Sequence, residues 1–250
     1  MTWTIDAGSA AIPTTTTTSP KTLSLAGYGV AADDLVILLA TSRDGDPATA
    51  SFSDPAGWTA LGPTLNHGPT GGSAYPGVAH RSWSRVIDGT ESDPSVTRSG
   101  SGGLSWGLSG IVLRSDHGES PTITNVWDDT TGSASGQFYQ PPSVSASRCS
   151  LFVQWAYGRA DTAGNAAFPG TDGSDEGWLG VGQSEPTETN PLGQWRFGTP
   201  NGILTAITTR GTVTSPNYRL VGTGGSALSR TISVLAPGGC GNHGWKVGTL

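Results

Sequence analysis

Residues 35–41 read Leu35-Val36-Ile37-Leu38-Leu39-Ala40-Thr41, and the first six of them are the longest apolar run in the 250-residue chain. The run is too short for a typical helix of a globular protein, and its β-branched residues favour extended backbone. Because it is continuously apolar and does not alternate with polar residues, it predicts a strand that is buried on both faces.

A second stretch of the same kind, Leu151-Phe152-Val153-Gln154-Trp155-Ala156-Tyr157, stands in the second half of the chain. Each stretch is followed by a Gly-Trp pair that opens another strand-like segment, at Gly57-Trp58 in the first half and at Gly177-Trp178 in the second. Matching features in the same order indicate an internal repeat.

The order of features continues to match beyond the Gly-Trp pairs. Each half has a long strand-like run after a Gly, over residues 77–86 and 202–210. Each half then ends on a Gly- and Ser-rich segment and a closing apolar strand, over residues 104–113 and 228–235. We interpret the two halves as tandem copies of one unit.

Short strands are predicted along the whole chain. Residues 83–87 and 106–113 alternate apolar with small or polar side chains, which is the period of a half-buried strand. Gly and Pro interrupt the sequence about every ten residues, as in sandwiches and barrels. The sequence therefore predicts an all-β fold of two tandem jelly-roll-like β-sandwich units, related by a pseudo-twofold axis.

The repeat also sets the predicted domain boundaries. The predicted parts are a first β-sandwich unit over residues 1–116, a connection over 117–142, a second β-sandwich unit over 143–237 and a Gly-rich tail over 238–250. A strand is expected inside the connection, over 123–127. Trp245 and Val247 in the tail predict that it docks, either onto this chain or onto a neighbour.

Large apolar residues on the predicted strands are the predicted structural core, because Trp on a strand is usually buried. They are Leu35, Ile37, Trp58, Trp83, Trp106, Phe152, Trp155 and Trp178. Trp127, Trp195 and Trp245 stand in or near predicted loops, and they are the candidate interface residues because Trp is enriched at interaction hot spots.

Composition narrows the classes of function. The chain has 13 basic and 19 acidic residues and a net charge of -6, and its basic residues form no cluster, which argues against nucleic acid binding. Low charge together with nine Trp argues against a disordered chain.

The N-terminus lacks a basic start followed by an apolar segment, and the run at 35–40 is too short to cross a membrane. We therefore expect synthesis in the cytoplasm and no membrane partner. The two cysteines, Cys149 and Cys240, make no disulfide framework, and the sequence leaves open whether they are bridged.

The sequence contains no recognisable catalytic constellation. Ser99-Gly100-Ser101-Gly102-Gly103 is predicted to be a hairpin and not a nucleophile elbow, because no helix follows it. Asp88, Glu91 and Asp93 lie in one loop, which predicts a solvated turn and not two acids that face a cleft. We predict no enzymatic activity, no catalytic residue and no cofactor.

No metal site is predicted either. Cys240 and His243 offer two ligands, whereas zinc takes three or four ligands from the protein. The acidic segment 172–176 has oxygen ligands that suit calcium, but it lacks EF-hand spacing, and Asp and Gly are also ordinary turn residues.

Four segments stand out as a set: residues 33–40, 55–62, 79–86 and 106–114. Together they resemble virion proteins of tailed bacteriophages, of the minor tail, tail-fibre-like and capsid decoration types. The resemblance covers residues 30–115 well and 143–236 weakly. The chain departs from the family pattern at Asp33, where the family has Gly, and at Ser115.

The resemblance implies a non-enzymatic structural protein of the virion, synthesised in the host cytoplasm, that binds other virion proteins of the capsid or tail. It also implies a homo-oligomer, because symmetric particle surfaces repeat identical patches. The alternative is a carbohydrate-binding or host-receptor-binding module on the phage tail, with a host-surface glycan as partner. A cell-wall hydrolase is a third class. Capsid and tail locations both stay open.

Overall fold

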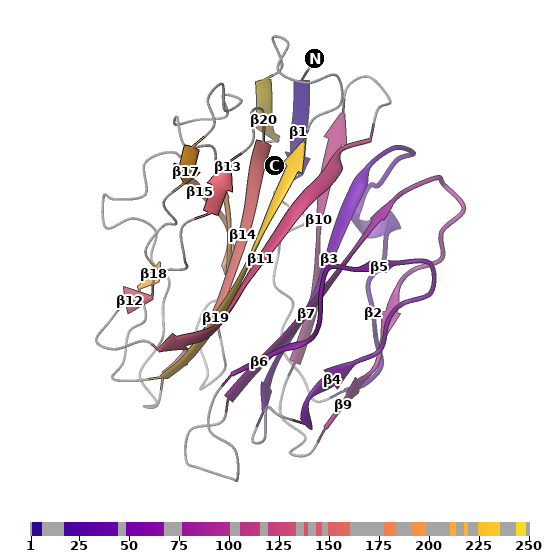
Figure 1. The fold of residues 1–250 in the computed structure, drawn as a ribbon. Coiled ribbons are helices and arrows are strands. Elements are labelled where there is room, and N and C mark those ends of the chain that lie inside the picture. The colour runs from indigo at the N-terminus through magenta and orange to yellow at the C-terminus, as the bar shows by residue number, and fades with distance from the viewer. Residues whose placement is uncertain are drawn as a thin grey trace.

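The computed structural model describes residues 2–6, 18–44, 49–67, 77–100, 106–115, 120–133, 138–139, 144–146, 150–160, 178–183, 192–198, 211–213, 218–219, 225–235 and 244–248. Within these ranges the protein is all-β and contains no α-helix (Figure 1). A 3-10 helix, η2 (Ala26–Tyr28), precedes the long apolar strand and ends at Gly29 in the left-handed conformation. The all-β prediction is confirmed at this level.

The larger sheet has seven strands, and six of them lie in the first half of the chain. Its order is β20 (Gly244–Gly248), β1 (Thr2–Asp6), β10 (Trp106–Ser115), β3 (Leu35–Asp44), β7 (Gly77–Val86) and β5 (Thr59–Ala60), with β6 (Leu65–His67) also paired to β7. All neighbours are antiparallel except β1 and β20, which are parallel. The segment that contains Trp245 therefore docks onto this chain, with Trp245 opposite Trp3.

The smaller sheet has five strands and is entirely antiparallel. Its order is β11 (Thr122–Ser133), β19 (Gly225–Leu235), β14 (Ser150–Ala160), β16 (Leu192–Gly198) and β15 (Trp178–Gln183). The predicted strand at 123–127 is part of β11, which is longer than expected. The segment 202–210, predicted as a strand, lies outside the described residues, as do Cys149 and Cys240.

Both sheets arrange their strands in the same order relative to the chain. Without β6 and β20, the first sheet uses β1, β3, β5, β7 and β10, and the second uses β11, β14, β15, β16 and β19. In each set the spatial order is first, fifth, second, fourth, third. The Gly-Trp pairs correspond as well, since Trp58 directly precedes β5 and Trp178 begins β15.

Short two-stranded ribbons accompany each sheet. In the first half they are β2 (Lys21–Thr22) with β8 (Ser95–Val96) and β4 (Ser51–Phe52) with β9 (Arg98–Ser99). In the second half they are β12 (Phe138–Tyr139) with β18 (Tyr218–Arg219) and β13 (Val144–Ala146) with β17 (Gly211–Val213). A single residue, Thr97, separates β8 from β9, and its N–H donates to Ser53 Oγ while its carbonyl accepts from Ser53 N. Residues 95–99 thus pair first with β2 and then with β4.

One face of the first sheet carries a hydrophobic core under these ribbons. From β3 it takes the alternate residues Val36, Leu38 and Ala40. The other members are Leu23, Leu25, Ala50, Phe52, Trp58, Ala79, Trp83, Ile87, Val96, Trp106, Leu108 and Val112. Most of the partners from outside the sheet belong to the ribbons or adjoin them, so the N-terminal half encloses a core of its own.

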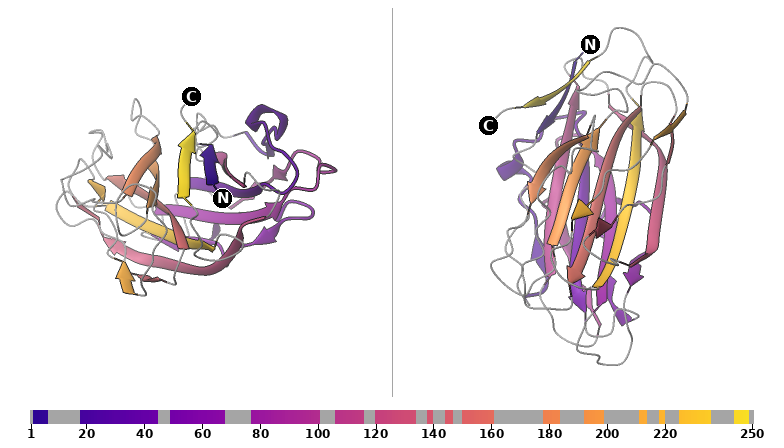
Figure 2. Two further views of the ribbon diagram at one scale, coloured as in Figure 1. Left: turned by 90° about the horizontal axis from the view of Figure 1, so that it is seen from above. Right: turned by 90° about the vertical axis from the view of Figure 1, so that its left-hand side faces the viewer.

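The opposite face of β3 presents Leu35, Ile37 and Leu39, which are also buried. Leu39 pairs with Ser82 of β7, and directly opposed residues share a face of the sheet. Ser82 is hydrogen-bonded to Arg230 of β19, so the second sheet covers this face. The stacked arrangement is visible in Figure 2. The apolar run 35–40 is therefore buried on both sides, between the ribbon layer and the second sheet.

Candidate functional site

One polar cluster of the described residues lies between the two sheets and is centred on Arg230. The Arg230 side chain is fully buried and binds Asp128 through two bonds, Nε to Oδ1 at 2.6 Å and Nη2 to Oδ2 at 2.8 Å. It also donates from Nη1 to Ser82 Oγ at 2.7 Å and from Nη2 to the Pro63 carbonyl at 3.2 Å. Its partners thus come from both sheets.

Strand register explains how these groups meet. Asp128 of β11 is directly opposite Arg230 of β19, and the neighbouring residues of β19 on the same face, Leu228 and Ile232, are apolar and buried. A buried guanidinium is tolerated when its charge is paired and its N–H groups have acceptors. Here the Asp128 carboxylate pairs with the charge. The same carboxylate, the Ser82 hydroxyl and the Pro63 carbonyl accept hydrogen bonds from the guanidinium.

Gly62 makes room for the guanidinium. Its φ is +107°, and a Cβ at this position would lie 2.9 Å from Arg230 Nη2 and 3.5 Å from Asp128 Oδ2. Both the backbone conformation and the close approach require glycine. Gly62 ends the segment 55–62, which therefore borders the interface between the sheets.

His80 lies two positions before Ser82 on β7, on the same face, and is fully buried. Its Nδ1 is 3.1 Å from the Ala40 carbonyl, an oxygen that can only accept, so Nδ1 carries the proton. Burial, with a smaller effect from the nearby positive charge of Arg230, lowers the pKa of His80 well below 6.5 and outweighs the bond to Ala40. His80 is neutral at pH 7.

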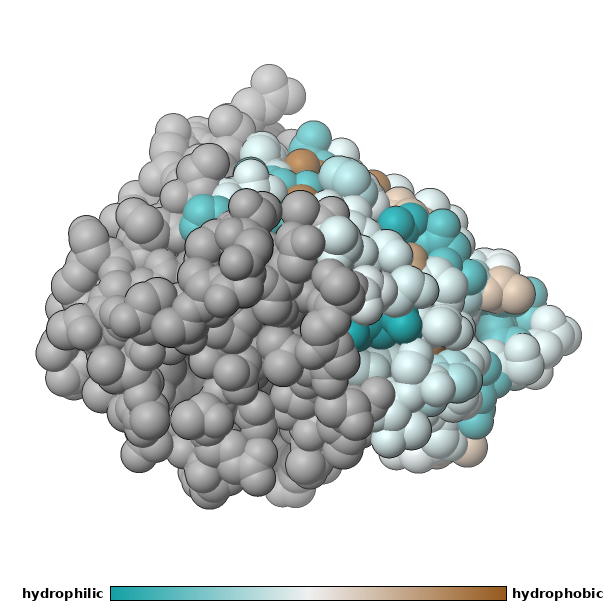
Figure 3. Space-filling view, turned by 90° about the horizontal axis from the view of Figure 1, so that it is seen from below, coloured by the Kyte–Doolittle hydropathy of each residue, from teal (hydrophilic) through white to brown (hydrophobic). Residues whose placement is uncertain are grey.

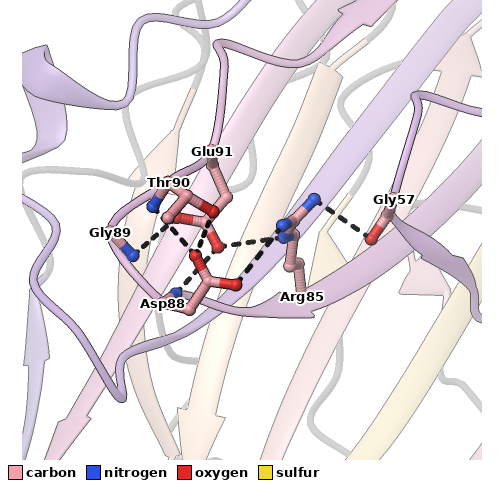
Figure 4. A network of polar contacts seen from close by, with 6 residues as sticks. All are labelled: Gly57, Arg85, Asp88, Gly89, Thr90 and Glu91. Atoms are coloured by element: carbon pink, nitrogen blue, oxygen red, sulfur yellow. Dashed lines mark hydrogen bonds and ion pairs between the residues drawn. The ribbon is translucent and has the colours of Figure 1, made fainter.

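A second polar cluster occupies the loop after β7 (Figure 4). The Glu91 carboxylate accepts from the N–H groups of Asp88 at 2.8 Å and Gly89 at 2.9 Å, and from Arg85 Nε at 3.0 Å. Asp88 Oδ1 accepts from both the N–H and the hydroxyl of Thr90. The loop therefore closes on itself through its own acidic side chains.

The prediction that Asp88, Glu91 and Asp93 lie in a solvated turn is wrong for Glu91, because the Glu91 side chain is only 2% exposed. Desolvation, the largest effect, raises the pKa of Glu91, but the backbone N–H donors together outweigh it and lower that pKa overall. Asp88 is exposed, and its bonds from Thr90 lower its pKa. The sequence could not reveal this arrangement, because the N–H donors depend on the loop conformation.

A third charged pair joins the start of β3 to β10. Asp34 accepts from Arg114 Nε at 2.9 Å and Nη2 at 2.7 Å, and from the N–H of Ala31 at 2.7 Å. Asp33, directly before Asp34, has a φ of 69°, a left-handed value that glycine adopts without strain.

The predicted core residues of the first half, Leu35, Ile37, Trp58, Trp83 and Trp106, are all buried. Two of these Trp rings satisfy their N–H groups, Trp83 with Asp54 Oδ1 at 2.7 Å and Trp106 with the Thr18 carbonyl at 2.8 Å. Phe152 and Trp155 lie in β14 and Trp178 in β15; only their backbone is described.

The three candidate interface tryptophans belong to three different strands. Trp127 lies in β11 and is half-buried, on the same face as Thr231 and opposite to the face that carries Arg230. Trp195 lies in β16, opposite Trp155 of β14, and Trp245 lies in β20. The loop placement of Trp195 and Trp245 was wrong, because Gly-rich flanks resemble loops even where the backbone pairs.

The visible surface of the described part is largely polar. Val86 is the exposed large hydrophobic residue among the side chains described, and Figure 3 shows hydrophilic and neutral residues over most of the coloured surface. No group of three or more metal-binding side chains occurs among the described residues. The segment 172–176, Cys240 and His243 lie outside them. Of the elements described, no helix is long and apolar enough to span a membrane.

Comparison with known proteins identifies no relative: the chain matches no family model, no curated protein and no solved structure.

Proposed function

We propose that the protein is a non-enzymatic structural component of a tailed-phage particle, either a capsid decoration protein or a minor tail protein. In this role it binds other virion proteins and repeats as a homo-oligomer on the particle. The observation that carries the proposal is the double-layered framework joined by Arg230, because that buried cation binds groups of both sheets and fixes their relative position.

The ion pairs that the arginine side chains form within the fold support a structural role. Arg230, Arg114, Arg85 and Arg81 each form an ion pair with a carboxylate of the same fold. Charges that are engaged in this way stabilise loop and sheet positions. A particle component needs a defined shape and a polar surface, and the intramolecular ion pairs and the largely polar described surface are consistent with both.

We further propose that the chain is built from two tandem jelly-roll-like units, over residues 1–116 and 143–237, related by a pseudo-twofold axis. The identical strand order of the two sheets supports this duplication, with the second set beginning at β11 (Thr122–Ser133), inside the predicted connection 117–142. The core beneath the ribbons of the first half supports its independence. Limited proteolysis tests the boundaries: cleavage within 117–142 should leave an N-terminal fragment with strand circular dichroism, and a fragment that loses it contradicts the division.

The function is tested on intact particles. Antibodies raised against the purified protein are applied to tailed-phage particles from the culture that expresses the gene, and the gold label is located by electron microscopy. Label at regular positions on the capsid or tail supports the proposal and separates the two locations. Particles that carry neither label nor a peptide of this protein in mass spectrometry contradict it.

The alternative functions are tested with the same purified protein. Host cell-wall glycans that quench Trp fluorescence in a saturable manner would favour a glycan-binding module, for which the half-buried Trp127 is the first residue to substitute. Clearing of a cell-wall zymogram would favour a hydrolase. The structural role predicts neither effect.

A further inference from the structure

Three buried polar atoms on neighbouring strands of the first sheet have no hydrogen-bond partner within the described part of the protein. They are Ser42 Oγ, Asn66 Oδ1 and Arg81 Nε. Ser42 is fully buried in β3, whereas Asn66 of β6 is half-buried and Arg81 of β7 keeps part of its side chain exposed. Buried polar groups of native proteins are almost always hydrogen-bonded, so three unpartnered atoms in one region point to a ligand.

Strand register places the three side chains on one face of the sheet, around Ala79. Ser42 is directly opposite Ala79 on one side, and Asn66 is directly opposite it on the other. Directly opposed residues share a face, and so do residues two apart on a strand, which places Arg81 with them. Ala40, opposite Arg81, and Ala79 present only methyl groups among the polar side chains. We call Ser42, Asn66 and Arg81 the edge cluster.

The other nitrogens of the Arg81 guanidinium are held at the exposed end of the edge cluster. Nη2 pairs with Asp54 Oδ1 at 2.5 Å, and Nη1 donates to Thr64 Oγ1 at 3.3 Å. Asp54 Oδ1 also accepts from Trp83 Nε1 at 2.7 Å, and the guanidinium lies over that ring, 5.8 Å from its centroid. Because the guanidinium is planar and rigid, these contacts fix the direction of Nε. The Asp54 side chain is 54% exposed, so the cluster borders solvent at this end.

The three unpartnered atoms define the kind of group that satisfies them. Arg81 Nε can only donate, Asn66 Oδ1 can only accept, and Ser42 Oγ can do both. An anion would satisfy the Arg81 nitrogen and repel the Asn66 oxygen, and a metal cation would do the reverse. A hydroxyl group or a water molecule both donates and accepts, and therefore matches all three atoms.

We propose that the edge cluster is a binding site for neutral hydroxyl groups, supplied either by enclosed water molecules or by a small saccharide or polyol from solution. Water molecules that bond buried polar groups are an integral part of native structures. A saccharide offers the same donor and acceptor on each hydroxyl, and the Asp54 carboxylate and the Thr64 hydroxyl at the exposed end offer partners for further hydroxyls. The proposal does not depend on whether the protein belongs to a phage particle.

The first experiment is thermal unfolding of the full-length protein, its Ser42→Ala variant and the matched variant Ser82→Ala. Both serines are buried in adjacent strands of the first sheet, and Ser82 has a known partner in Arg230. If Ser42 binds a hydroxyl group, Ser42→Ala removes a hydrogen bond and should lower the melting temperature, as Ser82→Ala does. If Ser42 is unpartnered, alanine removes the cost of burying a polar group, and the melting temperature should stay or rise. A melting temperature that stays or rises overturns the proposal.

The second experiment uses the wild type alone and distinguishes the two sources of hydroxyl groups. Crystals of the full-length protein are grown and frozen without polyols, and matched crystals are soaked in glucose or glycerol. Oxygen density within about 3.2 Å of at least two of the three atoms supports the site. Density that stays the same after soaking assigns the site to water, and glucose or glycerol density in its place assigns it to a saccharide or polyol. Absence of density at the three atoms in all crystals overturns the proposal.

Discussion

Arg230 and Ser82 stand 148 residues apart in the chain, and a hydrogen bond of 2.7 Å joins their side chains across the interface between the two sheets. Arg230 lies on β19, between β11 and β14 of the second sheet, and Ser82 lies on β7, beside the apolar strand β3 of the first. A bond at this place fixes how the two layers sit on each other, because apolar contacts alone have little directional preference.

Replacing Arg230 with Ala should destabilise the protein by about 1–3 kcal/mol, because buried Ser82 would lose its hydrogen-bond donor and Asp128, whose side chain is 25% exposed, would lose its ion-pair partner. Urea unfolding at pH 7 measures the change. The double variant Arg230→Met with Asp128→Leu should cost clearly less than the two single changes added together. The exposed Asp88, 3.9 Å from Arg85, provides the control, and Asp88→Asn should change stability less than Arg230→Ala does.

Replacing Gly62 with Ala combines a left-handed backbone with a steric conflict at Arg230. The backbone effect alone is about 1–2 kcal/mol. Gly89→Ala is the matched control, since φ is +88° there and a Cβ would meet nothing within 4 Å. The Gly62 variant should therefore be the less stable of the two. Equal losses in thermal unfolding would mean that Gly62 does not make room for the guanidinium.

Replacing Glu91 with Gln should remove part of the acid sensitivity of folding. The pKa of Glu91 is lowered from 4.5 in the folded protein. The carboxylate therefore contributes stability above pH 4.5, and this contribution is lost as the pH falls through the folded value. Wild type and variant should differ most near pH 7 and converge in acid. A difference that is constant from pH 7 to pH 3 would contradict the role of the carboxylate.

Trp83 contributes both volume and a hydrogen bond, and two substitutions separate them. Trp83→Ala should cost about 3–5 kcal/mol, because it opens a cavity in the core of the first half. Trp83→Phe keeps most of the ring volume and loses the bond from Nε1 to Asp54, for about 1–3 kcal/mol. Denaturant unfolding should rank the variants in this order, and the reverse order would place the ring outside the core.

The strand content was predictable because it depends on local patterns. The run at 35–40 indicated a strand buried on both faces, and β3 has both faces covered. The Gly-Trp pairs marked β5 and β15 correctly, because a glycine turn before an aromatic strand is a short-range signal. Trp195 and Trp245 were misplaced because pairing partners far along the chain, not local composition, turned their segments into strands.

The sequence by itself determined that this chain forms strands, since alternation, β-branching and turn residues act over a few residues. It did not locate the counterpart of β7: by strand order this is β16 (Leu192–Gly198), whereas the sequence pattern indicated 202–210. Only the tertiary structure decided that the second sheet covers the back of the first, that Arg230, Asp128, Ser82 and Gly62 meet, and that His80 lies buried beside them. These groups are tens to hundreds of residues apart, and burial between stacked layers depends on long-range register that no local pattern encodes.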